Sequence, residues 1–277
     1  MNSPLVSASW LAEHIDDGDL IVLDASSATN ISGKKPEFEN CVIQGARHFD
    51  LKNKFSDSDV PFPNTMPSQE QFQQEARNLE INNESIIVVY DNLGLYNSPR
   101  VWWMLKSMGH KNIAVLDGGL SAWVHAGLPT SENHATDYAH GNFTAEFTLR
   151  AVVAMEEVKA NILSKQFTLI DARSKGRFDG TAPEPREGLS SGHVPGSSNV
   201  PFQEVLSNGF MKSEEELSAI FDKLKLEVKP LVFSCGSGLT ACITLLAAEL
   251  VLPNQLAIYD GSWTEWASLE TNLIEKQ

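Results

Sequence analysis

Residues 232–241 read Val232-Phe233-Ser234-Cys235-Gly236-Ser237-Gly238-Leu239-Thr240-Ala241. An apolar run at 231–233 predicts a short buried strand before Cys235, and apolar residues at helical spacing from 239 to 250 predict a helix after it. The loop between them contains two glycines, which adopt backbone angles that other residues avoid. Such a loop at a helix start turns several N–H groups toward one point, with the positive end of the helix dipole behind them. A thiol in that place is expected to be ionised near neutral pH, which makes Cys235 a candidate nucleophile.

Length, charge and cysteine content limit the classes of function. The chain has 277 residues, which predicts two domains of ordinary size, and its net charge of −15 argues against nucleic-acid and anionic-membrane partners. No apolar run reaches the length of a membrane span, and the first residues lack a secretory-signal pattern. Three cysteines are too few for a disulfide framework, so we expect a reducing, cytoplasmic compartment. A buried structural role suits Cys41 and Cys242, but packing gives no reason for a Gly-Ser-Gly loop after Cys235.

The second half of the chain repeats the order of the first. Strand patterns end at Asp24 and at Asp171, which lie 147 residues apart, and Cys235 lies 144 residues after Asp91. The repeat predicts two copies of one α/β unit, residues 1–133 and 151–277, joined by a linker at 134–150. The first copy opens on a predicted helix at 6–15. Strands that alternate with helices imply a mostly parallel sheet flanked by helices on both faces, with ligands beyond the carboxyl ends of the strands, where Cys235 lies.

Several short motifs, in the same order across the two copies, resemble the tandem rhodanese sulfurtransferases over nearly the whole chain. The stretches that carry the resemblance are 23–26, 90–103, 116–119, 183–186, 192–196 and the cysteine loop. The loop Cys-Gly-Ser-Gly-x-Thr resembles that of 3-mercaptopyruvate sulfurtransferases, whereas thiosulfate-using members usually carry Arg and Lys after the cysteine. Asp91 stands in the cysteine position of the first copy, as in family members whose first domain is non-catalytic.

The resemblance implies a ping-pong reaction through a persulfide on Cys235. The donor would be 3-mercaptopyruvate, which leaves as pyruvate, and the acceptor would be a small thiol, a reduced thioredoxin-like protein or cyanide. The loop N–H groups are expected to hold the thiolate and the persulfide. Thiosulfate is the alternative donor, and a persulfide carrier fed by a partner protein is a further alternative. A Cys-x5-Arg phosphatase is disfavoured because position 241 is Ala241.

The resemblance also places the substrate-binding residues. Arg177 and Arg186 match family positions that hold the substrate carboxylate and keto oxygen, and a guanidinium suits a carboxylate because it donates two parallel hydrogen bonds. From the residues alone, surface ion pairs with Asp179, Glu184 or Glu187 are an equal alternative. The remaining residues predicted to bind the substrate belong to the cysteine loop: Gly236, Gly238, Leu239 and Thr240. Arg173 and Arg100 are interpreted as structural, and the tryptophans as packing residues.

Ser237 is the second predicted catalytic residue. It could donate a hydrogen bond to the substrate or relay a proton to the departing pyruvate enolate. In some relatives this serine is proposed to act with an Asp and a His from the first domain, but Val42 stands in the inferred His position and Gly33 or a neighbour replaces the Asp. Water or a main-chain group could then supply the proton. The sequence contains no metal-ligand cluster, Walker loop or dinucleotide fingerprint, so we expect no metal and no cofactor.

Overall fold

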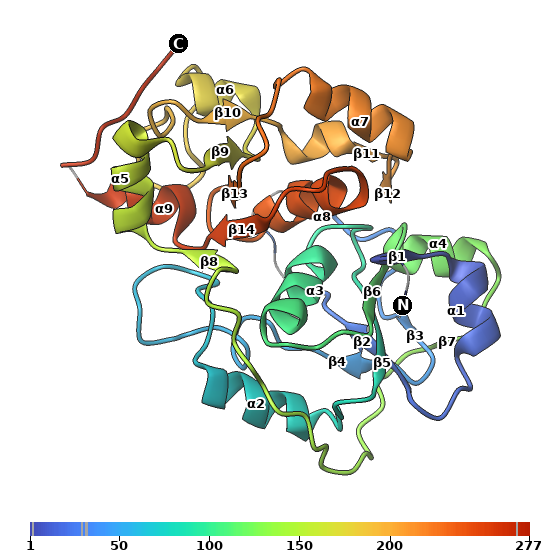
Figure 1. The fold of residues 1–277 in the computed structure, drawn as a ribbon. Helices are drawn as coiled ribbons and strands as arrows, with labels where there is room; N and C mark the ends of the chain where they lie inside the picture. The colour runs from blue at the N-terminus through green and yellow to red at the C-terminus, as the bar shows by residue number, and fades with distance from the viewer. Residues whose placement is uncertain (2, 29, 31–32, 270) are drawn as a thin grey trace. The chain divides into compact units, whose positions relative to one another are not determined.

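The computed structural model describes residues 1, 3–28, 30, 33–269 and 271–277, and it divides into two compact units (Figure 1). Unit 1 comprises Met1–Asp57, Met66–Thr148 and Asn208–Met211, and unit 2 comprises Ser58–Thr65, Leu149–Ser207 and Lys212–Gln277. Each unit therefore includes a short segment from the other half of the sequence. The domain bounds at 1–133, 134–150 and 151–277 stay a prediction.

Unit 1 is built around a five-stranded sheet in the order β1-β6-β5-β2-β4, and every neighbouring pair is parallel. Its elements are β1 (Leu5–Val6), α1 (Ala8–His14), β2 (Leu20–Asp24), β3 (Val42–Ile43), β4 (Arg47–His48), α2 (Gln69–Asn78), β5 (Ile86–Tyr90), α3 (Ser98–Ser107), β6 (Ile113–Leu116), α4 (Gly119–His125) and β7 (Thr130–Ser131). Strands β3 and β7 form a separate antiparallel pair.

Unit 2 has the same architecture. Its five-stranded parallel sheet has the order β10-β9-β13-β14-β8. The elements of the second half are β8 (Val152–Val153), α5 (Met155–Ser164), β9 (Thr168–Asp171), α6 (Lys175–Asp179), β10 (Ser198–Asn199), the 3₁₀ helix η1 (Phe202–Val205), β11 (Leu206–Ser207), β12 (Phe210–Met211), α7 (Glu214–Asp222), β13 (Leu231–Ser234), α8 (Ala241–Val251), β14 (Leu256–Tyr259) and α9 (Ser262–Ser268). Two copies of one strand order confirm the predicted repeat and the predicted α/β class.

The predicted helix at 6–15 is correct only in part. Leu5 and Val6 form the edge strand β1, which pairs with β6, and the helix begins after Ser7, whose hydroxyl accepts a hydrogen bond from the Trp10 N–H at 3.1 Å. An N-cap serine ends the extended backbone and satisfies a free helix donor. Two apolar residues directly before such a cap are too few to reveal a strand by periodicity.

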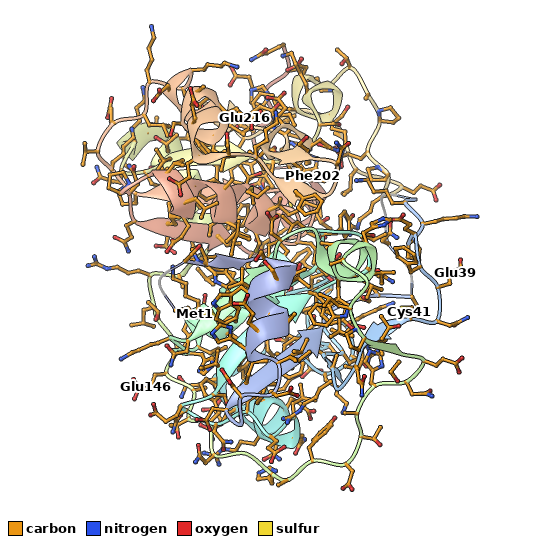
Figure 2. The ribbon with its side chains drawn as sticks, turned by 90° about the vertical axis from the view of Figure 1, so that its right-hand side faces the viewer. Met1, Glu39, Cys41, Glu146, Phe202 and Glu216 are labelled. Atoms are coloured by element: carbon orange, nitrogen blue, oxygen red, sulfur yellow. The ribbon has the colours of Figure 1, made fainter. Side chains whose placement is uncertain are left out.

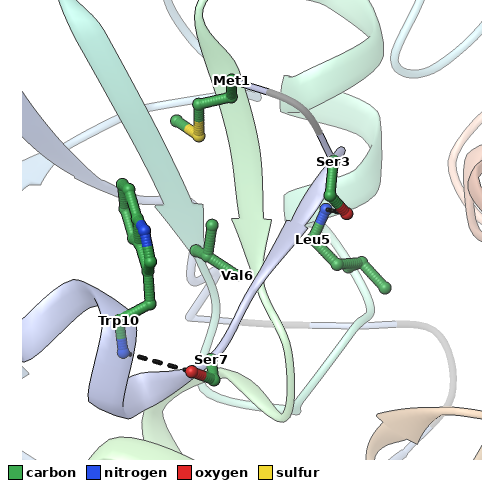
Figure 3. Close-up of a pocket in the computed structure, with 6 residues that line it drawn as sticks. All are labelled: Met1, Ser3, Leu5, Val6, Ser7 and Trp10. Atoms are coloured by element: carbon green, nitrogen blue, oxygen red, sulfur yellow. Dashed lines mark hydrogen bonds between the residues drawn. The ribbon is translucent and has the colours of Figure 1, made fainter.

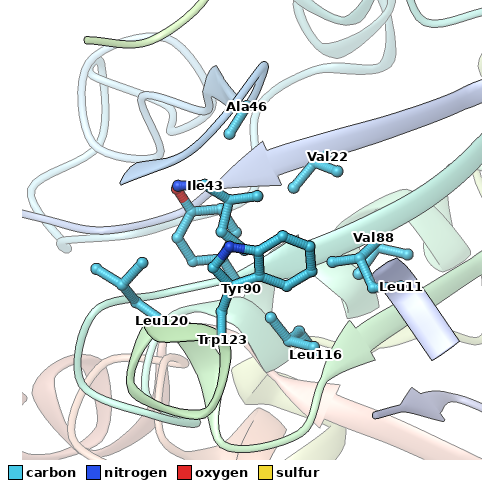
Figure 4. Close-up of a cluster of buried hydrophobic side chains, with 9 residues drawn as sticks. All are labelled: Leu11, Val22, Ile43, Ala46, Val88, Tyr90, Leu116, Leu120 and Trp123. Atoms are coloured by element: carbon cyan, nitrogen blue, oxygen red, sulfur yellow. The ribbon is translucent and has the colours of Figure 1, made fainter. Parts of the chain in front are cut away.

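Apolar side chains fill a core in each unit. Figure 4 shows the cluster of unit 1, in which Tyr90 and Trp123 pack among aliphatic residues from β2, β5, β6 and the helices. In unit 2 the core includes Trp263 and Trp266, which are fully buried, so the interpretation of these tryptophans as packing residues is confirmed. Glu216, labelled in Figure 2, closes a capping box with Ser213 at the start of α7. Within the described residues, the helices are all too short or too polar to cross a membrane.

Candidate functional site

Cys235 lies directly after β13 and six residues before α8 begins at Ala241, at the carboxyl end of a central strand of unit 2. Its two loop glycines serve different purposes. Gly238 has a φ of +74°, which side chains rarely adopt. At Gly236 a Cβ would stand 3.2 Å from Arg177 Nη2 and 3.4 Å from Arg186 Nη1, a close contact that a small shift of these side chains would relieve. The loop therefore brings both predicted substrate arginines beside the residue that follows the cysteine.

The Cys235 side chain is buried, with 1% of the residue exposed. The partly exposed residues of the loop are Gly236, Leu239 and Thr240, and Thr240 is the N-cap residue of α8. These three residues are among those predicted to bind the substrate, and that role stays a prediction. Ser237 is also buried, with 7% of the residue exposed.

Ser262, at the start of α9, fixes the shape of the loop. Its Oγ accepts hydrogen bonds from the N–H groups of Cys235 and Gly238, both at 3.1 Å, and donates to Tyr259 O at 2.8 Å. The sequence predicted that the loop N–H groups hold the thiolate, but those of Cys235 and Gly238 donate to the neutral Ser262 hydroxyl. Ser262 has a left-handed backbone, with a φ of +52°, and is fully buried against the loop. Sequence analysis missed this residue.

Arg177 is held by an ion pair. Its Nε and Nη2 donate to the two oxygens of Glu184 at 3.0 and 2.5 Å, in the parallel fork that a guanidinium and a carboxylate form. Glu184 Oε1 also accepts from Arg173 Nη1 at 2.8 Å. The ion pair with Glu184, which was the alternative interpretation of Arg177, is thus present. Arg177 nevertheless also lies beside the cysteine loop, at Gly236.

Arg173 is structural, as the sequence indicated. It is 1% exposed, pairs with Asp171 at 2.5 Å and lies 4.0 Å from the centre of the Trp263 ring. Burial alone would lower the pKa of Arg173, but the carboxylates of Asp171 and Glu184 raise it above its usual value. Asp171 and Glu184 are therefore the carboxylates that pair with Arg173, and Glu184 also pairs with Arg177.

Arg186 and Asn64 both contact Ser237. Arg186 Nη2 donates to Ser237 Oγ at 3.2 Å, and Asn64 Nδ2 donates to the same oxygen at 3.0 Å and to Ser237 O at 3.3 Å. Asn64 belongs to the segment Ser58–Thr65, which packs in unit 2 although it precedes β5 in the chain. Val42, which stands in the inferred His position, is a buried residue of β3 in unit 1. Sequence analysis did not identify Asn64 as a contact of the serine.

The equivalent loop of unit 1 holds a carboxylate. Asp91 Oδ2 accepts hydrogen bonds from the N–H groups of Tyr96, Asn97 and Ser98 at 2.8–2.9 Å and from Ser98 Oγ at 2.7 Å, while Oδ1 accepts from Leu93 N–H at 2.9 Å. Burial raises the pKa of the Asp91 carboxyl, and these donors oppose the rise. The loop of unit 1 that is equivalent to the Cys235 loop therefore directs its N–H groups at a carboxyl group, which is the side chain of its own Asp91.

Two other features of the described residues lie apart from this chemistry. A pocket in unit 1 contains none of the predicted site residues (Figure 3) and is lined by Met1, Ser3, Leu5, Val6, Ser7 and Trp10. No group of three or more His, Cys, Asp or Glu side chains is placed to hold a metal ion in the part of the chain that the structure describes.

Comparison with known proteins agrees with this geometry. The family model of the rhodanese-like domain matches residues 7–126 and 154–269. The chain is 39% identical to the 3-mercaptopyruvate sulfurtransferase of Mus musculus, over 95% of this chain and 91% of the relative, and 42% identical to the thiosulfate sulfurtransferase of the same organism, with the same coverage. Its fold is similar to the crystal structure of SseA from Escherichia coli, a 3-mercaptopyruvate sulfurtransferase, with a TM-score of 0.82, 37% identity and coverage of 95% of this chain and 99% of SseA.

Proposed function

Because the chain belongs to the rhodanese family, we propose that it is a sulfurtransferase that accepts sulfur from 3-mercaptopyruvate on Cys235 and releases pyruvate. The observation that carries this proposal is the position of Arg177 and Arg186, whose guanidiniums lie together at Gly236, beside the cysteine. One small anion with a carboxylate and a keto oxygen could accept hydrogen bonds from both guanidiniums. Cys235 is the nucleophile, and the loop residues Gly236 to Thr240 form the wall against which the donor binds.

The residue after the cysteine favours 3-mercaptopyruvate over thiosulfate. Identity over the whole chain does not separate the two donors, since relatives of both names are about equally similar. A basic side chain at position 236 would have to enter the space beside two guanidiniums, and Glu184 neutralises part of their charge. Thiosulfate carries two negative charges and would gain more from added cations than a monoanionic carboxylate does. Thiosulfate sulfurtransfer is therefore the second candidate function, with the lower specificity constant.

The reaction balances without a net change in protons. The Cys235 thiolate attacks the donor sulfur, the S–S bond forms, and the C–S bond breaks with its electron pair passing to the keto group as the pyruvate enolate. The enolate takes up one proton, and the former thiol proton of the donor leaves the new persulfide. The products are pyruvate and a persulfide anion on Cys235, and in this reaction Ser237 carries the proton between them.

The Asp91 carboxylate in unit 1 indicates where the outer sulfur of a Cys235 persulfide would lie in unit 2. An aspartate oxygen stands two bonds beyond Cβ, as does the outer sulfur of a cysteine persulfide. The donors to Asp91 include the N–H groups of Tyr96 and Asn97, and the residues 144 positions later are Thr240 and Ala241. We therefore infer that the N–H groups at the start of α8 hold the persulfide until a thiol, a thioredoxin-like protein or cyanide removes its outer sulfur.

Intact-mass analysis after addition of 3-mercaptopyruvate tests the proposal. We expect a gain of one sulfur atom with release of one pyruvate, and loss of both in Cys235→Ser. Cys41→Ser is the matched control, since Cys41 is a partly exposed free cysteine of unit 1, and it should behave as the unmodified protein. Sulfur addition that persists in Cys235→Ser, or a higher specificity constant for thiosulfate, would overturn the assignment. Sulfur transfer only from a partner protein, with no pyruvate released, would favour a carrier.

A further inference from the structure

Asn64 is a contact of the catalytic loop that no sequence pattern indicated, and its chemistry is well defined. Its side-chain nitrogen lies within hydrogen-bond distance of both Ser237 O and Ser237 Oγ. A carbonyl oxygen only accepts hydrogen bonds, so the contact with Ser237 O fixes which end of the amide is the NH2 group. Asn64 therefore donates to the serine hydroxyl and does not accept its proton.

The second contact of the hydroxyl has the same polarity. Arg186 Nη2 also donates to Ser237 Oγ, at 3.2 Å, and a guanidinium has no acceptor. A hydroxyl oxygen has two lone pairs and one proton. With both lone pairs directed at donors, the proton of Ser237 is directed away from Asn64 and Arg186, and it is available to a third group.

We infer that Asn64 is a positioning residue that keeps Ser237 a proton donor toward the leaving enolate; this inference rests on the proposed function. As the proton passes from Ser237 to the enolate oxygen, negative charge grows on Oγ, where the Asn64 amide and the Arg186 guanidinium stabilise it. Ser237 then regains a proton from the S–H of the new persulfide. Because an amide does not titrate near neutral pH, Asn64 performs this task without becoming a base itself.

The backbone of Asn64 decides which substitutions are informative. Its φ is +61°, a left-handed conformation that Asn, Asp and Gly tolerate and that strains most other residues. Asn64→Gly removes the amide without backbone strain, and Asn64→Asp replaces the donor by an acceptor of the same shape. The neighbouring Thr65→Val is the matched control, because it removes the hydrogen bond from Thr65 Oγ1 to Phe62 O at 2.9 Å in the same segment without touching Ser237.

The experiment compares two donors in single-turnover formation of the Cys235 persulfide. Transfer from 3-mercaptopyruvate leaves an enolate that needs a proton, whereas transfer from thiosulfate leaves sulfite and needs none. We expect the rate with 3-mercaptopyruvate to fall by about tenfold in Asn64→Gly and by more in Asn64→Asp. The rate with thiosulfate should stay within about twofold of the unmodified protein in Asn64→Gly, and Thr65→Val should leave both rates unchanged.

A double substitution keeps the test decisive if thiosulfate reacts too slowly to measure. Without the serine hydroxyl, Asn64 has no proton donor to orient, so Asn64→Asp combined with Ser237→Ala should be no slower than Ser237→Ala alone. Equal losses with both donors, or additive losses in the double variant, would overturn the inference. An unmodified protein that forms no persulfide from either donor would instead overturn the proposed function, so the two failures are distinguishable.

Discussion

Replacing Glu184 with glutamine tests whether a buried carboxylate holds the substrate arginine in place. The Glu184 side chain is 2% exposed and accepts from both Arg173 and Arg177. Glutamine keeps the shape of the side chain but removes its charge. Its NH2 group would also face the guanidiniums of Arg173 and Arg177, which donate hydrogen bonds and cannot accept them. Loss of one partner of a buried ion pair costs about 3–5 kcal/mol. Since the Arg177 side chain is 20% exposed, water screens part of the charge left behind, and we expect a loss of about 3 kcal/mol in the free energy of unfolding.

Urea unfolding followed by circular dichroism measures this loss, and donor kinetics measure its effect on the site. Glu187→Gln is the matched control, because it makes the same chemical change three residues along the same loop on an exposed residue. We also expect the KM for 3-mercaptopyruvate to rise by about tenfold, because Arg177 loses the fork that orients it. A stability within about 0.5 kcal/mol of the Glu187→Gln control, together with an unchanged KM, would refute the role given to Glu184.

Three further substitutions have defined outcomes. Ser262→Gly keeps the left-handed backbone but removes the hydroxyl that accepts from Cys235 and Gly238; we expect a cost of about 1–3 kcal/mol and faster amide exchange at Gly238, and unchanged exchange would contradict it. Asp91→Asn loses charge-assisted hydrogen bonds but avoids the cost of burying a charged group, which is the effect that raises the pKa of the Asp91 carboxyl. We therefore expect the free energy of unfolding, measured with urea, to fall by about 2 kcal/mol; a more stable variant would contradict this expectation. Burial lowers the pKa of His110 to about 4, so the ring stays neutral in the fold while the unfolded chain binds a proton below about pH 6.5. Stability should therefore fall by about 2 kcal/mol between pH 7 and pH 5, and His110→Phe, which keeps an aromatic ring against Phe143, should reduce that fall by the same amount.

The repeat, the parallel sheets and the place of Cys235 between a strand and a helix could be predicted because each depends on short-range pattern. The strand before Cys235 and the helix after it each lie within about ten residues of the loop. The positions of Arg177 and Arg186 came from the resemblance, since both lie far from Cys235 in sequence, and the structure places both at Gly236. Their role in binding substrate stays a prediction.

The residues that sequence reasoning missed act over long distances or through conformation. Asn64 lies 173 positions before Ser237, in a proline-containing stretch without periodicity, and no local signal connects them. Ser262 had a weak signal, because the repeat aligns it with Gly119, 143 positions earlier. Gly119 and Ser262 both have a positive φ, which favours glycine. A serine at such a position, where the other copy has a glycine, indicates that the hydroxyl has a structural role.

The pairing of Gly119 with Ser262 explains how two copies of one loop serve different ends. In unit 1 a Cβ at Gly119 would meet the backbone carbonyl oxygen of Asp91 at 2.4 Å, so no side chain fits there, and the loop N–H groups instead donate to the Asp91 carboxylate. A catalytic loop cannot depend on an anion that comes and goes with each cycle. In unit 2 the Ser262 hydroxyl bonds two loop N–H groups and is present throughout, so the loop keeps its shape with or without the outer sulfur. In the proposed reaction, the neutral hydroxyl at position 262 would let Cys235 gain and lose sulfur without a change in the shape of the loop.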